Sequence, residues 1–140
     1  MLYTLAKVRF AQGQFQESLH CYQRAVWQYE STLGTLHRRT ADACFKMAQV
    51  QVKLGGDQDP LPLIDKGLEA WCQDPETYGP EIARMSFLKA RALRTFQPSR
   101  ENEAKRLYET AALYGRKILG VNTTELKEED FDEWVSLWLR

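Results

Sequence analysis

The stretch LAKVRFAQGQFQESLHCYQRAV, residues 5–26, decides the fold of this 140-residue chain. Two segments rich in helix-favouring residues flank a glycine at position 13, which breaks the pattern between them. In the second segment Phe15, Leu19, Tyr22 and Val26 recur at spacings of three and four, so they share one face of a helix. The stretch therefore predicts two helices joined by a short turn.

The same spacing, broken by proline and glycine, continues along the chain, and no segment alternates with the period of two that a strand requires. It predicts seven helices, over residues 2–12, 15–33, 38–54, 60–73, 80–96, 100–119 and 124–139. Asp59 and Ser99 are expected to cap the N-termini of two of them. The expected left-handed C-cap glycines are Gly34, Gly55 and Gly120. The predicted fold class is all-α.

Composition narrows the class of protein. Hydrophobic residues make up 44% of the chain, charged residues 27%, and the net charge is zero, as expected for one globular domain. No apolar run is long enough to span a membrane, and the N-terminus lacks the pattern of a signal peptide. The three cysteines form no paired motif, which favours a reducing compartment, so a cytoplasmic location is expected.

Small and aromatic residues recur with a period of 42 residues. Shifting the sequence against itself superimposes one set of each kind: Ala6, Ala48 and Ala90, and Tyr3, Phe45 and Phe87. A period of this size indicates stacked helical hairpins. Ala25, Gly67 and Ala111 follow in the second helix of each hairpin, and small residues at facing positions allow two helices to approach closely.

These residues resemble the tetratricopeptide repeat (TPR). The parts of the pattern that match best are Leu2, Leu5, Ala6, Ser18, Tyr22 and Ala25 in the first unit. In the first unit Arg9 stands where the pattern has an aromatic residue. In the third unit Lys89 stands where the pattern has leucine, so the register of that unit stays open by one residue.

The 42-residue period is similar to that of the kinesin light chain type of repeat. The linker residues that carry this likeness are Leu33, Gly34, His37, Thr40 and Ala41. The resemblance implies a right-handed α-solenoid, a single TPR domain over residues 1–140. Its expected parts are hairpins over residues 2–33, 38–73 and 80–119 and a C-terminal capping helix over 124–139, where Phe131, Trp134 and Trp138 share one face.

No catalytic residue, metal ligand or cofactor is predicted. His20 and His37, the two histidines, lie on different elements without a metal-binding spacing. No serine or cysteine has the neighbouring base that a nucleophile needs, and no glycine-rich phosphate loop follows a strand. We therefore expect that the chain is not an enzyme.

The first helix of each hairpin is basic. Residues 1–12, 38–54 and 80–96 contain ten Lys or Arg and two acids, a balance of plus eight. In tetratricopeptide solenoids these helices line a concave groove, and the resemblance implies the following groove residues: Tyr3, Lys7, Phe10, Phe45, Gln49, Val52, Phe87, Arg91 and Arg94.

Aromatic rings beside basic groups suit an acidic peptide with apolar side chains, and kinesin light chains bind peptides that combine tryptophan with acidic residues. Two plainer interpretations stay open, in which the basic residues only form solvated faces and the rings only pack between adjacent first helices.

The leading hypothesis is a protein-protein interaction module that binds a partner's peptide or helix. The alternative is a structural segment of a larger repeat protein, or a homo-oligomer assembled through the N-terminal end, because Leu2 already lies within the first expected helix. Binding of single-stranded nucleic acid ranks below both, since the neutral net charge weakens attraction to phosphate.

Overall fold

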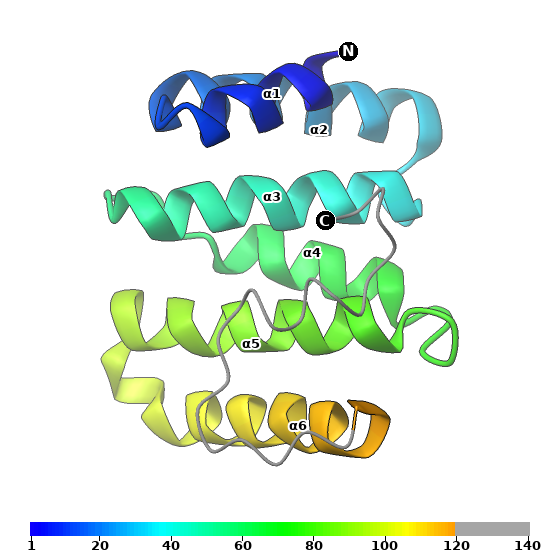
Figure 1. Ribbon diagram of the computed structural model, residues 1–140, viewed down its shortest axis with the longest axis vertical. Coiled ribbons are helices and arrows are strands. Elements are labelled where there is room, and N and C mark those ends of the chain that lie inside the picture. Colours follow the sequence, from blue (N-terminus) through cyan, green and yellow to red (C-terminus); the bar gives the residue numbers. More distant parts are fainter. Residues whose placement is uncertain (120–140) are drawn as a thin grey trace. The chain divides into compact units, whose positions relative to one another are not determined.

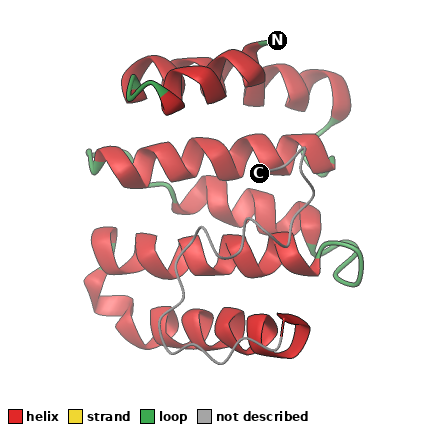
Figure 2. Ribbon diagram, viewed as in Figure 1, coloured by secondary structure: helices red, strands yellow, loops and turns green. Residues whose placement is uncertain are grey.

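A computed structural model describes residues 1–119 of the chain. In this part of the chain helices follow one another and no strand is present (Figures 1 and 2). The α-helices are α1 (Leu2–Ala11), α2 (Phe15–Leu33), α3 (Arg38–Leu54), α4 (Leu61–Trp71), α5 (Gly79–Phe96) and α6 (Glu101–Leu119), with a 3-10 helix η1 (Pro98–Arg100) before α6. The all-α prediction is confirmed. The expected capping helix over 124–139 lies outside the described residues.

The chain divides into two compact units, Met1–Ala70 and Trp71–Arg140. The first unit contains α1, α2, α3 and all but the last residue of α4. The described part of the second unit contains α5, η1 and α6. A single domain that joins the three hairpins remains a prediction, and each unit is described by itself below.

Small residues bring α1 and α2 together in the first unit. Ala6 and Ser18 are completely buried, and the Ser18 hydroxyl donates a hydrogen bond of 2.8 Å to the Ala6 carbonyl on the other helix. Tyr22 and Ala25 continue the same buried face of α2, at 2% and 1% exposure. The turn between the helices passes through Gly13, whose φ of +75° is a conformation that favours glycine. Helices α1 and α2 therefore form a helical hairpin.

Helix α3 packs against this first hairpin. Its buried residues Cys44, Met47 and Val50 form one hydrophobic cluster with Ala6 and Tyr22. His37 is the N-cap of α3 and its Nδ1 accepts a hydrogen bond of 3.1 Å from the backbone N–H of Arg39. At the other end Gly55 adopts the predicted left-handed conformation, with φ of +62° and ψ of 33°.

Helix α4 follows α3 after a loop and runs in the opposite direction (Figure 1). The Asp59 carboxylate accepts a hydrogen bond of 2.9 Å from the backbone N–H of Leu61, which confirms Asp59 as a capping residue. The Lys66 ammonium forms an ion pair with Glu30 of α2, and this hydrogen bond raises the pKa of Lys66. Leu63 of α4 also packs against the hydrophobic cluster of the first unit, so α4 contacts the first hairpin through an ion pair and through an apolar side chain.

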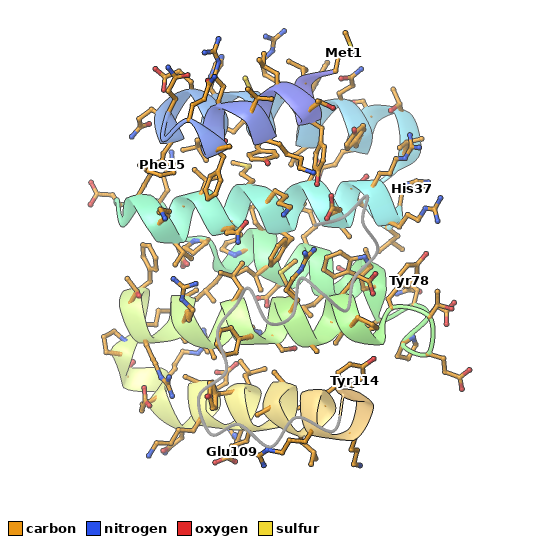
Figure 3. The ribbon with its side chains drawn as sticks, in the orientation of Figure 1. Met1, Phe15, His37, Tyr78, Glu109 and Tyr114 are labelled. Atoms are coloured by element: carbon orange, nitrogen blue, oxygen red, sulfur yellow. The ribbon has the colours of Figure 1, made fainter. Side chains whose placement is uncertain are left out.

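In the second unit α5 and α6 form a hairpin. Ala90 on α5 and Ala111 on α6 are both 1% exposed, as the prediction of small residues at close contacts requires. Gly79, the first residue of α5, lies against the Tyr114 side chain, so a Cβ added at Gly79 would lie 2.7 Å from the Tyr114 hydroxyl. Figure 3 shows Tyr114 reaching from α6 toward that end of α5.

Several details differ from the sequence-based prediction. Ser99 was expected to cap a helix, but it lies inside η1, because the chain after Pro98 makes a 3-10 turn before α6 begins. Gly34 has a positive φ of 94° but a ψ of 163°, an extended conformation rather than a left-handed one. The helix expected over 60–73 covers only Leu61–Trp71. Gly120, the third expected C-cap, lies outside the described residues.

Candidate partner-binding face

The basic first helices α1, α3 and α5 carry all nine predicted groove residues. Six of them lie in the first unit, on α1 and α3, and three lie on α5 in the second unit. Two of the six, Tyr3 and Lys7, lie one helical turn apart, and the Lys7 ammonium is 6.0 Å from the centre of the Tyr3 ring. This distance places a cation over an aromatic ring on a partly exposed surface of α1.

Tyr3 links α1 to α3. Its hydroxyl donates a hydrogen bond to the Asp42 carboxylate of α3, and its ring contacts Tyr22 edge to face at 5.7 Å. Asp42 is only 2% exposed, and the pKa of Tyr22 is raised by burial and by the nearby Asp42 charge. The prediction of groove residues missed Asp42. Asp42 lies one turn before Phe45, the residue that pairs with Tyr3 in the 42-residue repeat, but the repeat does not show that Asp42 contacts Tyr3.

A second cluster of rings and a cation lies at the other end of α1. The rings of Phe10 and Phe15 meet edge to face at 5.3 Å, next to the turn between α1 and α2. The Lys53 ammonium from α3 lies 5.9 Å from the Phe10 ring and 5.3 Å from the Phe15 ring. Figure 3 labels Phe15 at this end of the first unit. Sequence reasoning included Phe10 but not Lys53, because the contact depends on how α3 packs against the hairpin.

The remaining groove residues of the first unit lie on α3 and differ in exposure. Phe45 is completely buried, with the ammonium of its neighbour Lys46 lying 5.5 Å from its ring centre. Gln49 and Val52 are partly exposed on the same helix. Phe45 therefore contributes to the hydrophobic interior, whereas Gln49 and Val52 are accessible.

In the second unit Phe87 is also buried, at 5% exposure, and its ring packs on Tyr108 of α6 at 5.4 Å. Both rings belong to a hydrophobic cluster of the α5–α6 hairpin. Arg91 is exposed, while the Arg94 guanidinium lies 3.3 Å from Glu101 and 5.8 Å from the centre of the Tyr108 ring. Phe45 and Phe87 are thus interior side chains, and Phe87 packs within its own hairpin rather than between adjacent first helices.

Acidic and basic side chains of the first helices differ in burial. The two acids, Asp42 and Glu81, are 2% and 7% exposed. Eight basic residues on α1, α3 and α5 reach the surface at least in part: Lys7, Arg9, Arg38, Arg39, Lys53, Lys89, Arg91 and Arg94. Every charged side chain of these helices that is at least partly exposed is therefore basic.

The described residues offer little that points to chemistry. Residues 1–119 contain no cluster of three or more histidine, cysteine or acidic residues that would hold a metal ion. Burial raises the pKa of the Cys44 thiol to about 12, which keeps it protonated and unreactive. Among the same residues no helix is both long enough and apolar enough to cross a membrane.

Helical hairpins closed by small residues, with basic first helices, define an all-α repeat protein of the kind that presents surfaces to other proteins. A family model, the tetratricopeptide repeat, matches residues 1–73, slightly more than half of the chain. The chain belongs to the tetratricopeptide repeat family. Repeats of this family generally mediate protein–protein interactions or scaffolding and are generally non-catalytic. A comparison with curated proteins found no match.

Proposed function

We propose that this chain is a non-catalytic interaction module that binds an acidic, apolar peptide or helix of a partner protein on its first helices. The observation that carries the proposal is that every charged side chain of α1, α3 and α5 that is at least partly exposed is basic, with Lys89 and Arg94 paired to Glu103 and Glu101 of α6. Exposed side chains of one sign attract a partner of the opposite sign and raise its association rate.

Individual contacts indicate which groups are available to such a partner. Lys7 lies over the partly exposed Tyr3 ring, so a bound carboxylate at Lys7 would place an adjacent apolar side chain near an aromatic surface. Gln49 and Val52 add a hydrogen-bonding group and an apolar contact on α3. Arg94 already has Glu101 as a partner in its own hairpin, so we assign it a small share of the binding energy.

The test is the affinity of the full chain for a synthetic peptide that carries one tryptophan flanked by aspartates, measured by fluorescence anisotropy. Replacing Lys7 and Arg91 by glutamine should weaken binding about three- to tenfold at about 0.1 M salt and far less at about 1 M, where the Debye length is only about 3 Å. The matched control replaces Lys105 and Arg106, two exposed bases of the second helix α6, by glutamine.

The control pair removes the same charge from a different face, so it should leave the affinity nearly unchanged. Equal losses for the two pairs would show attraction to net charge alone and would contradict a binding face on the first helices. A peptide with lysines in place of the aspartates should not bind.

We also propose that the repeats are of the kinesin light chain type and that the protein acts in the cytoplasm. The 42-residue period is supported by the burial of Ala6, Ala48 and Ala90, all at 1% exposure or less. The three cysteines are free thiols, which suits a reducing compartment.

A structural or self-assembling segment is the second candidate. Exposed apolar side chains of the first hairpin favour it, because Leu5, Val8 and Trp27 are 42%, 47% and 71% exposed. If copies associate through these side chains, light scattering should show a mass that rises with concentration, and Trp27→Gln should reduce that rise. A constant monomer mass would contradict this candidate.

A further inference from the structure

A pocket in the first unit includes none of the nine predicted groove residues in its lining. It is lined by Gln16 and Leu19 of α2, by Gln51 and Leu54 of α3, and by Gly56 and Gln58 of the loop that follows α3. Its volume is about 180 Å³, which is room for several water molecules or for one side chain of moderate size. None of the lining residues is charged, so the pocket does not select an ion.

One polar group in this lining is buried without a partner. Gln51 is 6% exposed, and its side-chain Nε2 donates a hydrogen bond of 3.2 Å to the Gln58 side-chain oxygen. The Gln51 Oε1 atom is buried and accepts no hydrogen bond from any residue that the structure describes. Buried carbonyl oxygens of this kind normally have a donor, so this atom points to a group that enters the pocket.

The chemistry of the lining selects the group. A hydrogen-bond donor is needed at Gln51, and the apolar side chains of Leu19 and Leu54 suit the methylene groups behind it. Rotation of the Gln51 amide by 180° would leave an N–H without an acceptor in place of an oxygen without a donor. A carboxamide offers both a donor and an acceptor, so it satisfies Gln51 in either orientation. A carboxylate has no hydrogen-bond donor. Its transfer from water into this uncharged pocket would also lack a compensating positive charge.

We infer that this pocket is a recognition site for a glutamine or asparagine side chain of a partner polypeptide, held by Gln51 between Leu19 and Leu54. The site does not depend on the proposed binding face, because it uses no residue of that face. It adds selection for an uncharged amide to a protein whose first helices select for negative charge.

The test is an NMR titration of the full chain with propionamide, which has the atoms of a glutamine side chain beyond Cα. The methyl resonances of Leu19 and Leu54 should shift saturably. Butanone, which has the same shape but no donor, and propionate, which is charged, should each bind about tenfold more weakly. A short capped peptide with a central glutamine should shift the same methyls, and its glutamate counterpart should not.

Gln51→Met keeps the length of the side chain and removes its hydrogen-bonding groups, so it should weaken propionamide binding about tenfold. Gln28→Met, at an exposed position of α2 outside the pocket, is the matched control and should change nothing. Equal binding of butanone and propionamide by the unchanged chain would overturn the inference without any variant. So would the absence of saturable shifts, which means that the pocket holds only water. Binding of propionamide but not of the glutamine peptide would overturn the assignment to a polypeptide partner.

Discussion

Replacing Ala6 by leucine tests the packing that closes the first hairpin. Ala6 is completely buried, and the hydrogen bond of 2.8 Å from the Ser18 hydroxyl to its carbonyl shows how closely α1 and α2 approach there. Tyr22, at 2% exposure, belongs to the same cluster, so the three added carbons have no solvent-exposed path to occupy. The helices must separate or the leucine must adopt a strained rotamer.

Overpacking of a buried position costs about 1–3 kcal/mol. For a chain of this length each kcal/mol shifts the melting temperature by roughly 3–5 °C, so Ala6→Leu should melt roughly 3–15 °C below the unchanged chain. Far-UV circular dichroism during heating and in urea gives both the melting temperature and the free energy of unfolding. The matched control is Ala11→Leu, the same substitution at an exposed position of the same helix, which should change stability by less than about 0.5 kcal/mol.

Equal stability of Ala6→Leu and the unchanged chain would refute the reasoning, because it would mean that α1 and α2 have space at this position. A large loss for Ala11→Leu as well would show a general effect of leucine in α1. In that case close approach at Ala6 would not explain the result.

Three further predictions concern the burial of one cysteine and two local contacts. The exposed Cys72 should react rapidly with a thiol reagent at neutral pH, whereas Cys44, whose pKa burial raises to about 12, should react only after denaturation; equal rates would contradict its burial. Gly79→Ala should lower the free energy of unfolding by about 1 kcal/mol more in the unchanged chain than in a Tyr114→Phe background. A double-mutant cycle that shows no coupling between the two positions would rule out the contact. His37→Ala should lower the free energy of unfolding in urea by about 0.5–1 kcal/mol, because it removes the N-cap of α3, whereas His37→Ser should keep a cap and leave stability unchanged. Equal losses for the two variants would show that His37 does not stabilise α3 as an N-cap.

Helix positions in this chain follow directly from local sequence. The predicted helices over 15–33 and 38–54 match α2 and α3 to the residue, because long apolar stripes end at Gly34 and Gly55. The buried alanines Ala6, Ala48 and Ala90 were also predictable, since a 42-residue shift superimposes them. Local chemistry failed at Ser99, where a residue typical of caps lies inside a 3-10 turn.

The candidate face was harder to predict, because spacing places a side chain on a helical face without showing what that face contacts. Phe45 and Phe87 share their repeat position with Tyr3, yet both are buried and Tyr3 is partly exposed. Asp42 and Lys53 were missed because their contacts, with Tyr3 and with the Phe10 ring, join residues about 40 positions apart. Tertiary packing, which periodicity does not encode, decides these contacts.

The most direct test of the proposed function maps a bound peptide onto the chain. An NMR titration of the isotope-labelled full chain with the peptide of tryptophan flanked by aspartates should shift backbone amides of α1, α3 and α5, with the largest changes near Lys7, Gln49 and Arg91. Amides on the solvent-facing sides of α2 and α6 should stay in place. Shifts confined to α2, α4 and α6, or no saturable shifts at all, would contradict a partner-binding face on the first helices.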